Sequence, residues 1–367
     1  MQKLRVAVIY GGNKKTSGAV IREGSNPRSW KSYESVACDI ASALERIGFQ
    51  SVATLPESMR LGQQLQDGRI NLAWLNTGGV QGRSAISHAA AALEMLGVPY
   101  VGHDPLTAGL LDSKHHFKRQ LIALGISTPP FLVCHSADAV SGCLSARALK
   151  SQFGKWPHGF VVKPVTGRAS LNVHFVERAS ELREMVQHVM STTQTSVMIE
   201  AFIPGSEYCI AVSGPVIAKN GRLQQLPHPF AFSAVERVLD DGEHIFTSMD
   251  VKPITGARVR PLMPATDRSV LMRLEQLARQ VYTGTPLNTL VRLDVRADDK
   301  GNLFVLEVNP KPDLKAPGAT TSLICAGLGR YGMSYDDLVL SVFADRIATL
   351  FDQRNGSVEQ FFQTFEG

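Results

Sequence analysis

The chain has 367 residues, of which 44% are hydrophobic and 19% are charged, a composition typical of globular proteins. This length exceeds what one ordinary core holds, so two or three domains are expected. The formal net charge of +5 is spread along the chain without a run of Lys and Arg, which argues against a nucleic-acid partner and is compatible with anionic small substrates.

The five cysteines are scattered and form no CxxC pair. Neither a zinc site nor a disulfide framework is therefore predicted, and a cytoplasmic location is expected. The N-terminus runs directly into a strand without an apolar signal core, and no stretch reaches the roughly 20 apolar residues that span a membrane. We expect no membrane partner.

Residues 1–104 follow the strand–helix pattern of a doubly wound α/β domain. Apolar runs at 4–10, 51–55, 71–76 and 99–101 predict buried parallel strands, and helical spacing predicts helices at 35–47 and 85–96. Asn76 ends the third strand at a carboxyl edge, where ligands of open α/β sheets bind. His103-Asp104-Pro105 begins a linker, where we place the first domain boundary.

Two lysines stand out in the next segment. Residues 106–124 have the pattern of one helix with Lys114 in its middle, and a buried strand at 160–164 ends near Lys163. A loop of small residues and a strand at 173–176 follow. This order resembles a hairpin that covers phosphates, where backbone N–H groups and a lysine meet polyphosphate. The alternative is an ordinary hairpin whose lysine extends to solvent.

Further strands are predicted at 196–199 and 208–213, and helices at 179–190, 268–282 and 334–350. Residues 235–264 lack a regular pattern. We interpret them as a long loop, and such loops often form active-site lids.

Residues 290–309 predict a β-hairpin with its turn at 298–302. Strict alternation puts two sets of side chains on one face: Arg292, Asp294 and Arg296 from the first strand, and Val305, Glu307 and Asn309 from the second. Two carboxylates and an amide oxygen at one end of the hairpin suit Mg²⁺, which is bound by few carboxylates plus substrate phosphates. A surface hairpin with a salt bridge is the alternative.

These motifs occur in one order: the strand-end lysine before a small-residue loop, a Glu-x-x-Ile-x-Gly-x-Glu linker at 200–207, Arg-x-Asp at 292–294 and Glu-x-Asn at 307–309. Together they resemble the ATP-grasp enzymes, most closely the D-alanine–D-alanine ligase branch, over residues 4–350. The resemblance implies an α/β fold with a three-domain ATP-grasp architecture. A Rossmann-like N-terminal domain (1–104) would precede central (105–198) and C-terminal (199–367) α+β domains that clamp ATP.

The resemblance also implies a nucleotide site. Lys114 and Lys163 match the family's phosphate-binding lysines, Ser170 matches a serine of the loop over the phosphates, and Glu207 matches the acid that binds the ribose hydroxyls. The interdomain strand whose backbone reads adenine matches Glu200, Ala201, Phe202 and Ile203.

The reaction centre is implied in the same way. Asp294, Glu307 and Asn309 match the Mg²⁺ ligands, with Mn²⁺ as an alternative ion. Arg292 matches the arginine that stabilises the acyl phosphate and the tetrahedral species. The implied catalytic residues are Arg292 and Lys163.

The amino-acid pockets depart from the family's pattern. Asn76-Thr77 replaces its His-Gly pair, and Glu34 is the candidate for the acid that holds the first substrate's amine. Lys311 and Lys315 follow Asn309 and are candidates for acceptor binding, with two solvent-facing lysines as the alternative. Lys252 falls near the family's lid lysine.

We therefore predict a homodimeric, ADP-forming ligase that joins the carboxylate of one amino-acid-like substrate to the amine of another through an acyl phosphate. The alternatives are D-alanine–D-alanine ligase proper and a non-catalytic nucleotide-binding protein that keeps the fold.

Overall fold

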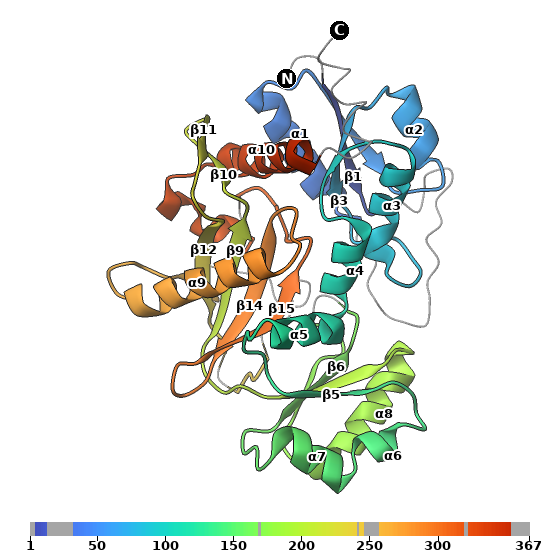
Figure 1. Cartoon of the computed structure of the whole chain (residues 1–367), viewed down its shortest axis with the longest axis vertical. Coiled ribbons are helices and arrows are strands. Elements are labelled where there is room, and N and C mark those ends of the chain that lie inside the picture. Colours follow the sequence, from blue (N-terminus) through green and yellow to red (C-terminus); the bar gives the residue numbers. More distant parts are fainter. Residues whose placement is uncertain are drawn as a thin grey trace.

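The computed structural model describes residues 4–12, 32–167, 170–240, 242–245, 257–318 and 322–353 (Figure 1). Its strands form an N-terminal parallel sheet, a central antiparallel sheet, a larger C-terminal antiparallel sheet and a separate hairpin. In the described part of the chain, no helix is long and apolar enough to cross a membrane. The predicted domain boundaries stay a prediction.

The N-terminal sheet is parallel and has the strand order β2-β1-β3-β4. Its strands are β1 (Arg5–Tyr10), β2 (Ser51–Pro56), β3 (Leu72–Asn76) and β4 (Tyr100–Val101). Helices α1 (Glu34–Ile47) and α10 (Tyr335–Gln353) cover one face, whereas α2 (Leu61–Asp67) and α3 (His88–Met95), which follows η1 (Ala85–Ser87), cover the other. Burial on both faces explains why the strands read as continuous apolar runs.

Helix α10 is shared between two parts of the molecule (Figure 1). Val339 and Phe343 pack into the core that α1 and the parallel sheet form, and Arg346 donates from Nε to the Tyr100 carbonyl at 3.0 Å. The opposite side of α10 contacts the hairpin of β10 (Val216–Lys219) and β11 (Arg222–Gln225). The helix was predicted, but the hairpin was not.

Three side chains of α10 bind the backbone of this hairpin. The N–H groups of Val216, Ala218 and Gly221 donate to Asp345 Oδ1 (3.2 Å), Ser341 Oγ (2.8 Å) and Asp337 Oδ1 (2.8 Å). The three acceptors are spaced four residues apart and therefore share one face of the helix. An edge strand is thus paired by helix side chains in place of another strand.

The central sheet is antiparallel, with the order β5-β8-β6-β7. Its elements are β5 (Phe131–Cys134), α6 (Val140–Cys143), α7 (Ala146–Phe153), β6 (Phe160–Pro164), β7 (His174–Val176), η2 (Ala179–Glu181), α8 (Leu182–Thr193) and β8 (Val197–Ala201). Val162 and Ile199 of the sheet pack with Val186 of α8 in an apolar core of their own.

Two helices, α4 (Pro105–Asp112) and α5 (Lys114–Ala123), replace the single helix predicted at 106–124. Ser113 breaks the helix with extended backbone angles (φ −91°, ψ 92°). The break is tolerated because Lys114 N–H donates to the Val165 carbonyl at 3.1 Å, which replaces its intrahelical bond. Lys114 therefore stands at the start of α5 and not in the middle of a helix.

The C-terminal sheet has the order β13-β12-β9-β14-β15 and is covered by α9 (Arg268–Gly284). Its strands are β9 (Glu207–Ser213), β12 (Phe230–Arg237), β13 (Val259–Pro261), β14 (Val291–Ala297) and β15 (Leu303–Asn309), and η3 (Cys325–Tyr331) follows. The prediction of one long loop at 235–264 is wrong where β12 and β13 pair, from Val235 opposite Pro261 to Arg237 opposite Val259. Residues 246–256, with the predicted Lys252, lie outside the described residues.

The predicted hairpin is present as β14 and β15. Arg292 lies opposite Asn309, and Asp294 lies opposite Glu307. In the turn, Asp298 N–H donates to the Asn302 carbonyl at 2.9 Å.

A β-bulge interrupts this pairing next to Asp294. Val295 pairs with Val305, so Leu306 is an extra residue that has no opposite partner in the ladder. The predicted alternation is therefore wrong for Val305, which is fully buried in the core under α9. Leu306 instead lines the site beside Glu307.

Candidate functional site

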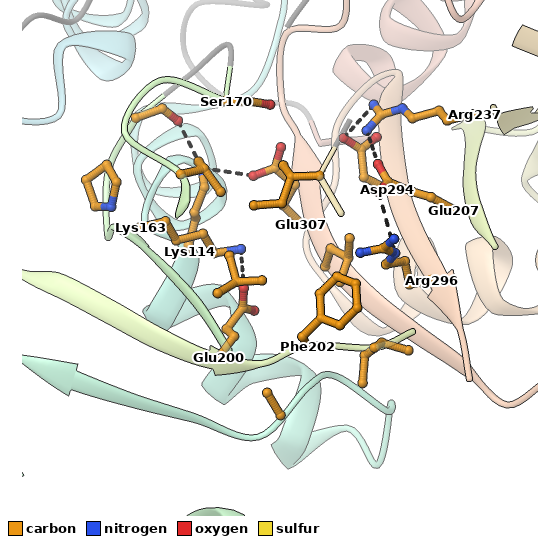
Figure 2. A pocket seen from close by; sticks show the side chains of 18 of the residues that line it. Lys114, Lys163, Ser170, Glu200, Phe202, Glu207, Arg237, Asp294, Arg296 and Glu307 are labelled. Carbon is orange, nitrogen blue, oxygen red and sulfur yellow. Dashed lines mark hydrogen bonds and ion pairs between the residues drawn. The ribbon is translucent and has the colours of Figure 1, made fainter. Parts of the chain in front are cut away.

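A pocket lies between the central and C-terminal sheets (Figure 2). Its charged side chains come from seven elements: Lys114 on α5, Lys163 on β6, Glu200 on β8, Glu207 on β9, Arg237 on β12, Asp294 and Arg296 on β14, and Glu307 on β15. Six of these eight residues were predicted as site residues, and the structure brings them together.

One end of the pocket is lined by the segment that links the two sheets. Ala201 and Phe202 donate their N–H groups to the carbonyls of Pro130 (2.9 Å) and Gly159 (3.1 Å). Ile203 also lines the pocket, and we find no partner for its N–H among the described residues. This end of the pocket therefore offers a backbone donor, as the edge of a nucleobase requires.

Aromatic side chains surround this backbone. The guanidinium of Arg296 lies 4.5 Å from the centroid of the Phe202 ring, and Phe175 packs edge-on against that ring at 4.9 Å. A flat, apolar wall with a cation over it suits a planar heterocycle.

The two predicted phosphate lysines each contact a carboxylate. Lys114 Nζ lies 2.9 Å from Glu307 Oε2 and donates to the Gly167 carbonyl at 2.9 Å. Lys163 pairs with Glu200. Both lysines line the pocket together with Ser170 (Figure 2), so two cations and the loop after β6 face one space.

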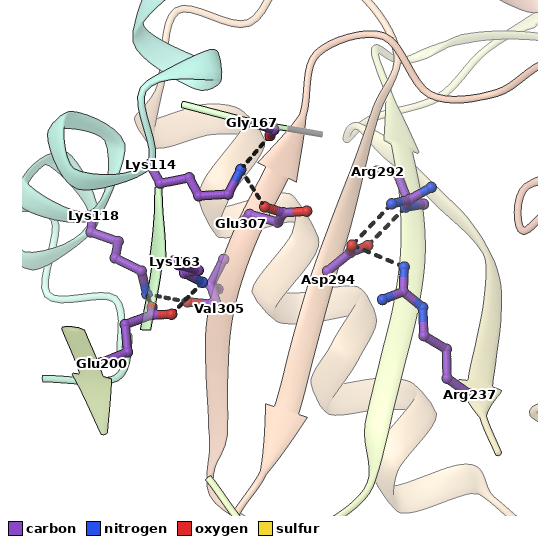
Figure 3. A network of polar contacts seen from close by, with 10 residues as sticks. All are labelled: Lys114, Lys118, Lys163, Gly167, Glu200, Arg237, Arg292, Asp294, Val305 and Glu307. Carbon is purple, nitrogen blue, oxygen red and sulfur yellow. Dashed lines mark hydrogen bonds and ion pairs between the residues drawn. The ribbon is translucent and has the colours of Figure 1, made fainter. Parts of the chain in front are cut away.

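Asp294 is held by two arginines (Figure 3). Arg292 binds both carboxylate oxygens at 2.7 and 2.9 Å, and Arg237 donates to Oδ2 at 2.9 Å. Burial alone would raise the pKa of Asp294, but these two guanidinium groups hold it well below its ordinary value. Asp294 is therefore ionised throughout the physiological pH range.

Glu207 lies in a row of alternating charges across the sheet. Arg237 and Arg296 are its register partners on the neighbouring strands β12 and β14. Arg237 donates to Glu207 Oε1 at 2.6 Å, and Arg296 lies at 3.6 Å from Oε2. Arg237 thus bridges the acid predicted for the ribose and the acid predicted for the metal.

Two predicted residues, Arg292 and Asn309, are absent from the described lining of this pocket. Arg292 is directed at Asp294, and Asn309 Oδ1 accepts the N–H of Lys311 at 3.0 Å. Among the described residues, no three His, Cys, Asp or Glu side chains converge as a metal site. A divalent ion at Asp294 and Glu307 would therefore need ligands from a nucleotide, which is how proteins usually hold Mg²⁺.

Three predicted substrate residues gather around Tyr33 at the carboxyl end of the parallel sheet. Asn76 Nδ2 donates to the Tyr33 carbonyl at 3.1 Å, and Glu34 follows Tyr33 and accepts from Tyr10 at 3.4 Å. Lys311 Nζ lies 3.4 Å from the centroid of the Tyr33 ring. Tyr33 has a left-handed backbone (φ 56°), which is costly for an aromatic residue.

The other two predicted substrate residues do not join this group. Lys315 is exposed, and its N–H donates to Asp313 Oδ1 at 3.1 Å. Lys252 is not among the described residues.

Sequence reasoning missed three charged residues at the site: Lys118, Arg237 and Arg296. Arg296 was placed on the correct face of the hairpin but received no role. Arg237 lies on a strand that was not recognised. Lys118 lies four residues after Lys114, and this helical spacing was the available signal.

Comparison with known proteins identifies the family. A family model described as "D-ala D-ala ligase C-terminus" matches residues 121–344. D-alanine–D-alanine ligases of Desulforudis audaxviator and Pseudomonas putida are 27% and 28% identical, over 91% and 94% of this chain and 96% and 94% of theirs.

Solved structures share the fold. D-alanine–D-alanine ligase from Bacillus anthracis, described as complexed with ATP, has a TM-score of 0.69 at 18% identity and covers 95% of this chain and 99% of its own. The VanG D-Ala:D-Ser ligase from Enterococcus faecalis has a TM-score of 0.67 at 18% identity, over 94% of this chain and 100% of its own.

The fold is that of the ATP-grasp enzymes, with a parallel N-terminal sheet followed by antiparallel sheets, as the motifs predicted. The chain belongs to the D-alanine–D-alanine ligase family. At the level of this family, it is an ATP-dependent, ADP-forming ligase that joins a carboxylate to an amine.

Proposed function

We propose that this chain activates the carboxylate of one amino-acid-like substrate as an acyl phosphate and transfers it to the amine of a second. The observation that carries the proposal is the set of side chains on one sheet face, where Asp294 and Glu307 lie opposite each other and Lys114 reaches Glu307 at 2.9 Å. Acidic and basic side chains from seven elements line the pocket there, and convergent polar groups of this kind are typical of small-ligand sites.

We assign each group of residues a binding role from its position in the pocket. The aromatic wall and Ile203 N–H receive the adenine, and Glu207 binds the ribose hydroxyls. Lys114 and Lys163 bind the phosphates, because their ammonium groups line the pocket from two different elements. Arg292 is held rigidly by two bonds to Asp294 and stabilises charge on the reacting carboxylate.

We assign Asp294, Glu307 and Asn309 to a magnesium ion. The donor set fits, since carboxylate and amide oxygens are hard ligands and the first two face each other across the hairpin. When bound, the ion would neutralise phosphate charge. Lys114 contacts Glu307, so its ammonium group and the ion would compete for the same carboxylate. When a nucleotide binds, Lys114 would move from Glu307 to the phosphates.

We place the amino-acid substrates near Tyr33, between the parallel sheet and the turn after Asn309. Asn76 contacts the carbonyl of Tyr33 from the end of β3, and Lys311 contacts its ring from the turn. A lysine over an aromatic ring favours an acceptor with a carboxylate that can replace the ring as the partner of the ammonium group. A relative of this chain is named D-alanine–D-alanine ligase, so D-alanine is the first substrate to test. We do not assign it as the substrate.

We propose a homodimer as well. Met95 (83% exposed) at the end of α3 and Leu106 (79% exposed) at the start of α4 place apolar side chains on the outside of the N-terminal part. Light scattering after gel filtration tests the dimer, and a monomer at micromolar concentration would exclude it.

The reaction is tested by phosphate release. The purified chain with Mg²⁺ and ATP is mixed with pairs of L- and D-amino acids and dipeptides, and the products are weighed by mass spectrometry. We expect ADP and phosphate in equal amounts with a product that has lost one water. ATP binding without turnover across the whole screen would instead favour the non-catalytic alternative.

A further inference from the structure

Three charged side chains are buried together behind the phosphate end of the pocket (Figure 3). Lys118 on α5 pairs with one carboxylate oxygen of Glu200, and Lys163 on β6 pairs with the other. The exposed fractions of the three side chains are 1%, 2% and 8% for Lys118, Glu200 and Lys163. Two ammonium groups thus share one carboxylate in a dry environment.

Of these three residues, Glu200 and Lys163 belong to the described lining of the pocket, and Lys118 does not. Lys118 lies on the far side of Glu200, where its Nζ is 2.5 Å from Thr128 Oγ1 and 3.5 Å from the Val305 carbonyl. Its ammonium group cannot meet a ligand while Glu200 stands between them. Lys118 can therefore influence a ligand only without touching it, through its pairing with Glu200 and through its charge.

The charges of this cluster do not cancel. With Lys118 present, the single carboxylate of Glu200 serves two cations, so one positive charge remains uncompensated. Without Lys118, Glu200 and Lys163 would form a neutral ion pair. The ammonium group of Lys163 would then stay bound to Glu200 and would be less available to a phosphate. An uncompensated charge in a water-poor site is costly unless an anion approaches.

We propose that Lys118 is a positioning residue for ATP. By sharing the carboxylate of Glu200, it keeps the Lys163 ammonium group available to the polyphosphate. This role rests on the ATP binding of the proposed function but assigns a residue that does not touch the nucleotide.

The protonation state of Lys118 provides a second test of the proposal. Burial lowers the pKa of Lys118 to about 8, and this shift outweighs the attraction of Glu200. The charged groups that face Lys118 are Glu200 from β8, Lys163 from β6 and Glu307 from β15. Above about pH 8 the cluster would lose its excess charge, and the affinity for phosphates should fall with it.

The test compares ligands that differ only in phosphate charge. Dissociation constants of adenosine, ADP and ATP are measured by calorimetry for the wild type, Lys118→Met and Lys118→Arg. Lys118→Met should weaken ATP binding by about tenfold or more and ADP binding by less, with adenosine unchanged, because one charge is removed near the phosphates. Lys118→Arg keeps the charge and should restore ATP binding.

Thr128→Val is the matched control. Thr128 donates to the same Val305 carbonyl at 2.8 Å, so this variant disturbs the same packing without changing a charge. Its ATP and adenosine affinities should change together, if at all.

Equal weakening of ATP and adenosine by Lys118→Met, or no change in either, would overturn the proposal. If Lys118→Met does not fold, the pH series decides. Between about pH 7.5 and 9.5, wild-type affinity for ATP relative to adenosine should fall, whereas that of Lys118→Arg should not. Parallel pH curves would reject the role of Lys118, and a wild type that binds no ATP would reject the proposed function instead.

Discussion

Each carboxylate of the pocket contacts a base from another element. Glu200 is paired with Lys118 and Lys163, Glu307 with Lys114, and Asp294 with Arg292 and Arg237. Such buried pairs contribute little net stability, because desolvation offsets their attraction. They do fix the position of each charge, so that a ligand meets groups that are already aligned.

At the residue scale, Glu307→Gln tests the reaction centre. The amide keeps the size of the side chain and removes its charge, so the fold should persist while turnover falls by about 100-fold or more. Circular dichroism and phosphate release measure the two quantities. Turnover like that of the wild type would remove Glu307 from the metal site.

Arg237→Met tests the bridge between Glu207 and Asp294. Loss of a buried guanidinium that contacts two acids should lower the free energy of unfolding by about 3 kcal/mol in urea denaturation. In the presence of ATP, added Mg²⁺ should stabilise this variant more than it stabilises the wild type, because a cation that competes for Asp294 is gone.

Arg260→Met is the matched control for this variant. Arg260 also contacts two acids, Glu236 and Asp267, but its side chain is 47% exposed. Its loss should cost no more than about 1 kcal/mol and should not change the effect of Mg²⁺. Equal effects of Mg²⁺ on Arg237→Met and the wild type would count against the assigned metal position.

The predictability of single site residues depended on local pattern. Asp294 and Glu307 could be found because a hairpin with a short turn fixes which residues lie opposite each other. Arg237 could not be found, because its strand pairs with β13 across more than twenty residues, so no short turn fixes which residues lie opposite each other. Tyr33 was missed because a left-handed backbone at an aromatic residue follows from tertiary contacts and not from propensity.

At the element scale, two breaks in regular structure set the site. The bulge at Leu306 inverts the alternation of β15, so that Val305 enters the core while Glu307 keeps its place opposite Asp294. The break at Ser113 puts Lys114 at the start of α5. Neither break follows from hydrophobic periodicity, since both depend on partners that the fold supplies.

The contact between α10 and β10 predicts that the stability of the folded protein depends on pH. Burial raises the pKa of Asp345 to about 6, above its model-compound value of 3.8. Between these values the folded protein binds more protons than the unfolded chain, so stability should fall as pH rises from about 4 to 6 and then level off.

Asp345→Asn should remove this step. An amide oxygen can still accept the Val216 N–H, which lies 3.2 Å from Oδ1, but it carries no charge. At pH 7 the variant should be more stable than the wild type by up to about 3 kcal/mol. Urea denaturation at several pH values measures this, and a pH step retained in the variant would assign it to another group.

At the scale of the whole molecule, the proposed nucleotide pocket and the Tyr33 cluster are built from different parts of the chain. They meet along β15 and the turn after it, where Asn309 accepts the N–H of Lys311. The family fold could be predicted from the order of the motifs. Most of the charged residues that line the pocket could be predicted in the same way. At the proposed substrate end, Glu34, Asn76 and Lys311 were each predicted from the family resemblance. Their meeting at Tyr33 could not be predicted, because they come from a helix start, a strand end and a turn that have no shared pattern.

Lys311→Ala tests whether the Tyr33 cluster binds an amino-acid substrate separately from ATP. The ammonium group of Lys311 lies over Tyr33 and does not belong to the described lining of the pocket, so the KM for the acceptor should rise by about tenfold while the KM for ATP stays unchanged. The exposed Lys315 offers the control, and Lys315→Ala should change neither value by much. A rise in the KM for ATP alone would place Lys311 at the phosphates.

The sharing of α10 has a consequence for the order in which the chain folds during its synthesis. The last strand of the parallel sheet ends at Val101, but Val339 and Phe343, which complete the core on one face, belong to a helix that begins at Tyr335. A ribosome needs on the order of 10 to 50 s to make the intervening residues. During this time α1 alone covers that face of the first sheet, and the part that α10 later covers stays exposed. The N-terminal part is therefore synthesised first, but its core is completed last.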